Sequence, residues 1–279
     1  MIQLLRHDDV TQLLCSTRTS RMLDYVVSAY LVRGVLVDTA FPAVGAELAR
    51  WAAGSPPAGA FVTHHHEDHA GNIVRLAALG IPLAVAPDTL ERLRAPKPIG
   101  LYRRTCWGSA PALIRDVEPF SHPSLALLPA RGHSADHHVV WDAERGTMFG
   151  GDLFIGVKVR IAHPGEDIRG QVLALRAMAA LQPVRFFDAH RGALARPVEQ
   201  LLAKAAWMEE MIGAIEQLVG AGWNDRAVRN QVLGREDLTG WLSAGDYSRL
   251  NFVRSVRARL PDSTSAGAPS TMSRPTGHP

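Results

Sequence analysis

The sequence predicts a mixed α and β domain followed by a helical segment. Short β-rich runs alternate with segments of helical periodicity over residues 1–196, and from Pro197 onward no strand is indicated. Hydrophobic residues make up 47% of the 279 positions, which is ample for a buried core. The helical segment is expected to span residues 197–260. The remainder, residues 261–279, is rich in Ser, Thr, Pro and Gly and is expected to be disordered.

The first elements lead directly to a run of histidines. Two β-rich runs, 25–32 and 35–38, flank Arg33-Gly34 and predict a hairpin. A helix is expected from Pro42 to Gly54, because apolar residues recur at helical spacing between a proline start and a glycine stop. A strand over 60–63 and a helix over 73–79 enclose the histidines. The run therefore occupies a strand-to-helix turn.

The later part of the first domain repeats the alternation. After a strand at 83–85 and a helix at 88–94, residues 95–119 are rich in proline and are interpreted as a surface excursion rather than an active-site flap. The following segments are the predicted strands 125–128, 138–141, 147–149 and 184–187, the helix 167–181, and the C-terminal helices 197–219, 225–233 and 247–260.

Composition argues against several classes of protein. The net charge of +3, from 30 basic against 27 acidic residues, without a local basic cluster, disfavours a nucleic-acid partner. Cys15 and Cys106 lie far apart, so no disulfide framework or thiolate zinc site is predicted. The N-terminus lacks a signal-peptide pattern, and no run of about 18 apolar residues suggests a membrane span. We expect a cytoplasmic enzyme without a membrane partner, and its oligomeric state stays open.

The run Thr63-His64-His65-His66-Glu67-Asp68-His69 carries the chemistry. In a random sequence the pattern His-x-His-x-Asp-His would arise with odds on the order of one in a thousand. Alternate residues leaving a strand point the same way, so His64 and His66 can converge on one ion. Asp68 and His69 can then address a second one. Nitrogen and oxygen ligands suit zinc, with iron and manganese as alternatives.

Three further sequence positions complete a family pattern. Gly132-His133-Ser134, Gly151-Asp152-Leu153 and Ala189-His190-Arg191 each follow a predicted strand, and Val37-Asp38 ends an earlier one. In this order and placement, residues 20–195 resemble the metallo-β-lactamase-fold hydrolases, in particular the glyoxalase II-like members. The resemblance implies a four-layer αββα sandwich in which residues 1–196 form the catalytic domain.

The same resemblance implies a role for each motif residue. It assigns His64, His66 and His133 to a first metal ion, Asp68, His69 and His190 to a second, and Asp152 to a carboxylate bridge between two divalent cations. A metal-bridging hydroxide would then be the nucleophile, and Asp68 would be the catalytic residue that orients it and returns a proton to the leaving group. Asp38 would orient ligands. His137, in a segment similar to the Gly-His-Thr-Pro-Gly-His of glyoxalase II-like members, would brace the site.

Neighbouring residues are interpreted as supporting. His65 and Glu67 fill the variable places between ligands and are expected to be solvated or to lie behind the ligands. His122, His138 and His163 are expected to be structural or surface residues.

The resemblance implies a dinuclear hydrolase acting on a small-molecule ester, thioester or lactone. Residues 153–160 lack the Gly-Arg or Gly-Lys ending of glyoxalase II, which disfavours a glutathione thioester. The enzyme alternatives are a phosphodiesterase or nuclease of the same fold and a mononuclear iron persulfide dioxygenase. A non-enzyme alternative is a module that binds nucleic acid or a partner through the Arg-rich residues 223–259.

Overall fold

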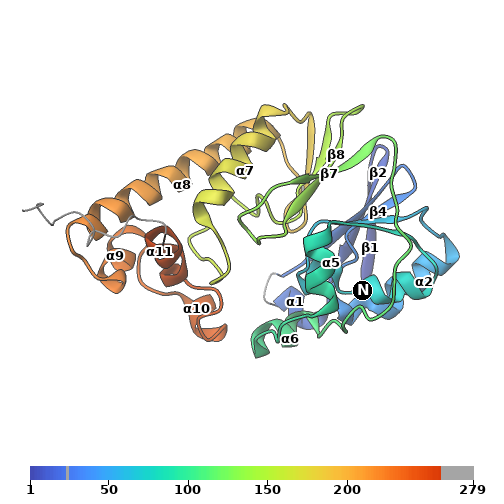
Figure 1. The fold of residues 1–279 in the computed structure, drawn as a ribbon, viewed down its shortest axis with the longest axis horizontal. Helices are drawn as coiled ribbons and strands as arrows, with labels where there is room; N and C mark the ends of the chain where they lie inside the picture. Colours follow the sequence, from blue (N-terminus) through green and yellow to red (C-terminus); the bar gives the residue numbers. More distant parts are fainter. Residues whose placement is uncertain (23–24, 259–279) are drawn as a thin grey trace, which may run out of the picture.

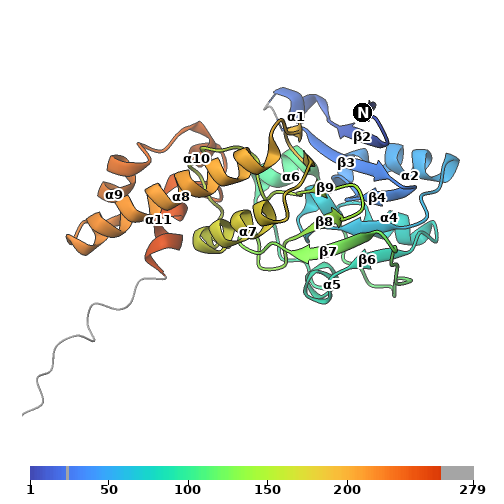
Figure 2. The same ribbon diagram turned by 90° about the horizontal axis from the view of Figure 1, so that it is seen from above.

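Two β-sheets pack face to face in the computed structural model, which describes residues 1–22 and 25–258, and the C-terminal helices extend away from them (Figures 1 and 2). The first sheet has six strands in sequence order. They are β1 (Ile2–His7), β2 (Val10–Cys15), β3 (Val27–Val32), β4 (Val35–Val37), β5 (Ala60–Val62) and β6 (Leu83–Val85). The first four pair antiparallel, and β4, β5 and β6 are parallel. The predicted hairpin is thus confirmed as β3 and β4.

The second sheet has five strands in the order β11-β10-β9-β8-β7. They are β7 (Leu125–Pro129), β8 (His138–Asp142), β9 (Thr147–Phe149), β10 (Arg185–Asp188) and β11 (Gly192–Ala193). The strands β9 and β10 run parallel, and the other pairs are antiparallel. The helix between β9 and β10 supplies the crossover that a parallel pair requires.

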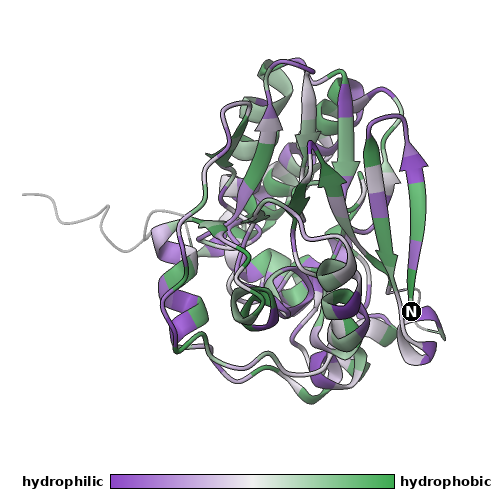
Figure 3. Ribbon diagram, turned by 90° about the vertical axis from the view of Figure 1, so that its right-hand side faces the viewer, coloured by the Kyte–Doolittle hydropathy of each residue, from purple (hydrophilic) through white to green (hydrophobic). Residues whose placement is uncertain are grey.

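The faces of the two sheets that meet are apolar, and Figure 3 shows their strands mostly in the hydrophobic colour. At the centre of this interface the rings of Tyr30, Phe149 and Phe187 contact one another, with centroids 5.2–5.4 Å apart. Burial of large aromatic side chains supplies much of the driving force that holds the sheets together.

Helices cover the outer face of each sheet. On the first sheet these are α1 (Arg18–Met22), the 3-10 helix η1 (Pro42–Val44), α2 (Gly45–Gly54), α3 (Glu67–Ala70), α4 (Ile73–Ala78), α5 (Pro87–Arg94) and α6 (Leu101–Trp107). On the second sheet lie α7 (Ile168–Ala180) and α8 (Pro197–Gly220), followed by α9 (Asp225–Val232), α10 (Leu238–Leu242) and α11 (Arg249–Arg257). The layers follow the order α, β, β, α, which confirms the predicted sandwich.

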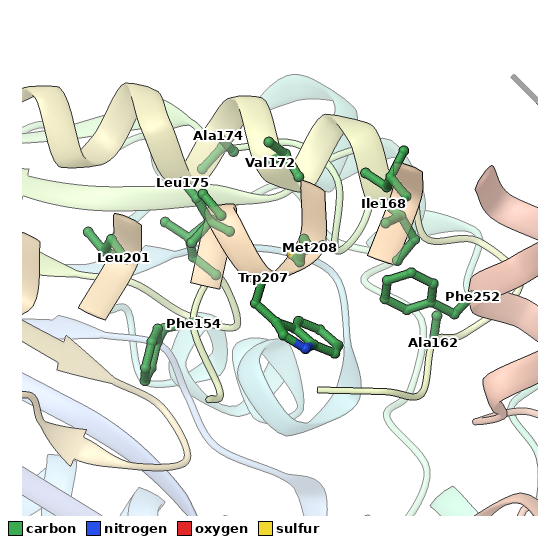
Figure 4. Packing of buried hydrophobic residues seen from close by; sticks show 14 of the residues in the cluster. Phe154, Ala162, Ile168, Val172, Ala174, Leu175, Leu201, Trp207, Met208 and Phe252 are labelled. Carbon is green, nitrogen blue, oxygen red and sulfur yellow. The ribbon is translucent and has the colours of Figure 1, made fainter. Parts of the chain in front are cut away.

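The C-terminal helices continue the core of the second half. Figure 4 shows side chains of α7 packed against α8, with Trp207 on the side of α8 away from α7. The Trp207 ring lies 6.1 Å from that of Phe252 in α11. Leu201, Met208 and Phe154 belong to the same buried cluster. This cluster contains residues on both sides of residue 196, so the packing does not mark a domain boundary there. The boundary at residue 196 stays a prediction.

The stretch 95–119 lies mostly at the surface, as expected, but it also contains structure that was not predicted. This stretch contains α6, and its Cys106 and Trp107 side chains are buried in the core under the first sheet. The flanking prolines and the adjacent Arg103 and Arg104 obscured the helical periodicity, and Arg103 is buried because it forms an ion pair.

No helix among residues 1–22 and 25–258 is long and apolar enough to cross a bilayer. Two other expectations remain predictions. The cytoplasmic location is untested, and the expected disordered tail lies outside the described residues.

Candidate metal centre

The predicted ligands lie where strands of both sheets end. His64 and His66 follow β5, and Asp68 and His69 belong to the short helix α3. From the other sheet, His133 follows β7, Asp152 follows β9 and His190 follows β10. The structure therefore brings all seven predicted ligands to one edge of the sandwich.

A first group consists of His64, His66, His133 and Asp152, all of them buried. One potential ligand atom from each residue lies within 4.8 Å of the others. His133 Nε2 is 3.0 Å from His66 Nδ1 and 3.3 Å from Asp152 Oδ2. Three imidazoles and a carboxylate at these distances are a ligand set suited to a divalent transition-metal ion.

A second group consists of Asp68, His69, Asp152 and His190. The Nε2 atoms of His69 and His190 lie 3.0 and 3.1 Å from Asp152 Oδ1. The same two atoms are 3.7 and 3.6 Å from Asp68 Oδ2. Asp152 is therefore shared, with Oδ2 facing the first group and Oδ1 facing the second.

The hydrogen bonds behind the imidazoles orient their free nitrogens toward the centre. Asp38 Oδ2 accepts from His69 Nδ1 at 2.8 Å and from Thr63 Oγ1 at 3.0 Å. Because the Thr63 hydroxyl donates to Asp38, it accepts from His64 Nδ1, also at 3.0 Å. With both Nδ1 atoms protonated, the Nε2 atoms of His64 and His69 are available as ligands. Asp38 thus contacts His69 directly and His64 through Thr63, and its role in orienting the ligands stays a prediction.

Three atoms of the centre are buried without a hydrogen bond of acceptable geometry to any described residue. They are His64 Nε2, His69 Nε2 and Asp152 Oδ1. Buried polar atoms without a partner are rare and costly in folded proteins. Because these atoms belong to the two ligand groups, one cation bound at each group would satisfy all three, and the residues present fit a metal site.

Electrostatics divides the imidazoles into two kinds. Burial lowers the pKa of His64 and His66 well below the usual range and that of His133 to about 3, so these rings are neutral. Burial acts the same way on His69 and His190, but the Asp152 carboxylate overrides it, so the pKa of His69 is raised and that of His190 rises to about 9. Asp152 therefore favours positive charge at the second group, whether on a proton or on a metal cation.

His137 makes the contacts of a bracing residue. Its Nδ1 donates to the carbonyl oxygen of Ala130 at 3.0 Å, and its Nε2 accepts from the backbone N–H of Asp152 at 3.1 Å. His138 is buried with Nδ1 bonded to the Asp136 carbonyl, and His122 accepts from the Ser124 N–H, as expected of structural histidines.

His65 and Glu67, the residues between the ligands, have different surroundings. His65 is partly exposed and bonds to Asp136 through its backbone N–H and its ring Nδ1. Glu67 is not solvated: it is buried and accepts two hydrogen bonds from Arg103 of α6, at 2.6 and 2.5 Å. Periodicity could not reveal this pair, because its partner lies in a segment interpreted as a loop.

A cavity of about 200 Å³ opens beside both groups, with Asp68, His133, Asp152 and His190 in its lining. The remaining wall comes from residues to which the sequence assigned no role, namely Tyr25, Val26, Tyr102, Trp107, Ile155, Val159, Ile161, Glu166, Ile168, Gln171, Arg191, Lys204, Met208, Thr239, Tyr247 and Phe252. His163, expected to be structural or at the surface, lies beside the site with its ring 6.5 Å from that of His66.

Comparison with known proteins identifies a family and solved structures of the same fold. A model of the Metallo-beta-lactamase superfamily matches residues 23–190. A metallo-beta-lactamase family protein from Thermus thermophilus is 16% identical with a TM-score of 0.63, covering 90% of this chain and 91% of that chain. A metallo-beta-lactamase from Erythrobacter litoralis is 19% identical with a TM-score of 0.52, covering 75% and 96%. These two likenesses concern the fold.

One curated relative is similar in sequence. The "Beta-lactamase-like protein 2 homolog" of Caenorhabditis elegans is 24% identical over 140 residues, which is 50% of this chain. The match spans 44% of that protein, so this chain covers less than half of its length.

Proposed function

The chain belongs to the metallo-beta-lactamase superfamily, and on that basis we propose that it is a dinuclear metal-dependent hydrolase of a small ester, thioester or lactone. The observation that carries the proposal is the position of Asp152. Its Oδ1 lies 3.0 and 3.1 Å from imidazoles of one ligand group, and its Oδ2 lies 3.3 Å from an imidazole of the other. A carboxylate placed in this way suits a bridge between two cations.

The two groups divide the ligands as follows. His64, His66 and His133 would hold one ion, and Asp68, His69 and His190 would hold the other. Two bound divalent ions would supply a water molecule of lowered pKa and would polarise the scissile carbonyl. Zinc is the proposed metal, because nitrogen and oxygen ligands without thiolate suit it, with iron and manganese as alternatives.

Asp68 is proposed as the acid and base of the reaction. Its carboxylate lines the cavity and lies 3.6 Å from His190 Nε2, so it can contact both the nucleophilic water and the substrate. A carboxylate there can accept a proton from the water and return it to the leaving group. Asp38 and His137 would keep the surrounding groups in place during this exchange.

The cavity supports a small and largely apolar substrate. Trp107, Ile168, Met208 and Phe252 lie in its wall, and its volume of about 200 Å³ is suited to a short acyl group rather than to a polynucleotide. A persulfide dioxygenase would need only one iron, and it would leave Asp68, His69 and His190 without a role as ligands. The second group therefore favours the dinuclear proposal.

The test combines metal analysis with a substrate panel. We expect close to two zinc, iron or manganese ions per chain, and hydrolysis of an ester, thioester or lactone that a chelator abolishes. Asp152→Ala should lose both the activity and metal content, because it removes the group shared by both ion sites. Asp116→Ala is the matched control, because the Asp116 side chain is 99% exposed and should affect neither.

Three outcomes would contradict the proposal. Normal turnover by Asp152→Ala would remove the proposed bridge. One iron per chain, with oxygen consumption, would indicate the dioxygenase. A protein that bound no metal would leave a binding module, and salt-dependent binding to nucleic acid would then identify its partner.

A further inference from the structure

Lys204 is a buried cation with no function in the mechanism above. It belongs to α8, outside the part of the chain that matches the family model, and it is only 3% exposed. Among the described residues, the carboxylates of Asp188, Glu166 and Asp152 act electrostatically on its ammonium group, but none forms a salt bridge with it. A buried lysine without an ion-pair partner is unusual and requires other strong contacts.

Those contacts lie immediately after the shared ligand. Lys204 Nζ donates to the carbonyl oxygens of Leu153 and Phe154, at 3.0 and 2.6 Å. These residues follow Asp152 directly in the chain. The ammonium group therefore ties the last large helix of the protein to the turn that carries the proposed metal bridge.

The turn itself is in an unfavourable conformation. Ile155 has a φ of +53°, a region that β-branched residues rarely occupy, and Gly151 on the other side of Asp152 has a φ of +50°. A strained backbone persists only where its surroundings hold it. An isoleucine at this place means that contacts from outside the turn, rather than its own preference, determine its shape.

Three side chains supply such contacts. Besides Lys204, Asp188 Oδ2 accepts from the Ile155 N–H at 2.8 Å, and Arg191 Nε donates to the Ile155 carbonyl at 2.7 Å. Asp188 Oδ1 also accepts from the N–H of His190 at 2.9 Å. Asp188 ends β10 and Arg191 follows it, at the edge of the matched region, whereas Lys204 brings a polar contact from the C-terminal segment.

We infer that Lys204 is a positioning residue for the metal centre: its ammonium group holds the strained turn 152–155 so that the two oxygens of Asp152 face the two ligand groups. The inference rests on the proposed function where it concerns metal binding. It also states that α8 is part of the site rather than an appendage to it.

Lys204→Met tests the inference, because methionine has a similar length and cannot donate to the two carbonyls. Lys97→Met is the control, since Lys97 is exposed and its removal should be silent. In metal-free protein that remains folded by thermal melting, we expect faster amide hydrogen exchange at residues 153–156 in Lys204→Met. In chelator competition, we expect its metal affinity to fall about 10–100-fold, the range found when supporting residues of a metal site are removed.

Combining Lys204→Met with Ile155→Gly tests whether the strained backbone at Ile155 matters. Glycine adopts a positive φ without penalty, so in Ile155→Gly the turn should depend less on Lys204. We therefore expect Lys204→Met to weaken metal binding by a smaller factor in Ile155→Gly than in the wild type. If Lys204→Met does not fold, Lys204→Leu, which likewise cannot donate a hydrogen bond, is judged by the same two measurements.

Unchanged exchange at 153–156 together with metal affinity within about threefold of the wild type would overturn the inference. An equal loss of affinity in both backgrounds would also overturn it, because strain in the turn would then play no part. Wild-type protein that bound no metal would refute the proposed function instead, and the exchange measurement would still decide the role of Lys204.

Discussion

Replacing Arg103 by methionine should destabilise the protein by about 3–5 kcal/mol, the usual consequence of removing one partner of a buried ion pair. Arg103 and Glu67 are 6% and 5% exposed, and two hydrogen bonds of 2.6 and 2.5 Å join them. The single change leaves the Glu67 carboxylate buried without a counter-charge. It also releases α6, which carries Tyr102 and Trp107 of the cavity wall.

The magnitude depends on burial, and the chain offers a matched control. Arg176 makes the same two-bond contact with Glu209, but those side chains are 49% and 42% exposed. Arg176→Met should therefore cost less than about 1 kcal/mol. The double variant Glu67→Leu/Arg103→Met removes both buried charges and should recover most of the loss, because a buried pair is often no more stabilising than apolar residues of similar volume.

Urea denaturation of metal-free protein, followed by circular dichroism, measures these free energies of unfolding. If Arg103→Met lowered the free energy of unfolding by less than about 1 kcal/mol, the reasoning would be refuted, because the ion pair would then behave like one exposed to water. A double variant no more stable than Arg103→Met would refute it in another way. The uncompensated charge would then not be the source of the loss.

Three further predictions concern the residues around the ligands. Asp38→Ala removes the acceptor of His69 Nδ1 and should weaken metal binding about 10–100-fold in chelator competition, and unchanged affinity would exclude an orienting role. His65→Ala should lower kcat/KM less than about tenfold, because His65 bonds to Asp136 and not to the ligand groups, and a collapse in activity would mean that the ligands are assigned in the wrong register. Burial would raise the pKa of Asp136, but hydrogen bonds from His65 and Ser134 hold it below its usual value, so its stabilisation is present above about pH 4 and is lost as the pH falls further. The unfolding free energy of Asp136→Asn should accordingly fall less steeply than that of the wild type between about pH 4 and about pH 2, and parallel curves would contradict this.

Local patterns in the sequence predicted much of the fold. The hairpin of β3 and β4, the helix α4 after the histidine run and the helix α8 each have a periodic apolar pattern with a proline or glycine near an end. The helix α6 was not predicted, because it is held by one long-range ion pair and by two aromatic residues rather than by a periodic apolar face. The helix α10 is five residues long, too short for periodicity to reveal.

The predicted ligands form a sequence motif, whereas the support around them does not. His64, His66 and Asp152 could be selected because strand ends and residue types coincide there. Lys204 could not, because it is a single lysine in an otherwise apolar helix face and its acceptors are main-chain carbonyls 50 and 51 residues earlier. Tyr247 lies near His163 and Tyr102 only in space. Such contacts depend on how the C-terminal helices pack, which local sequence does not encode.

Each ligand group takes its members from both sheets. His64 and His69 come from the half built on β5, and Asp152 and His190 come from the half built on β9 and β10. An ion held between them would be a cross-link between the two layers of the sandwich, comparable in effect to a disulfide but reversible by chelation. Because the unfolded chain cannot present these ligands together, the ion would also stabilise the folded state according to its free concentration. The metal supply of the cell would then influence not only the rate of the reaction but also how much folded protein persists.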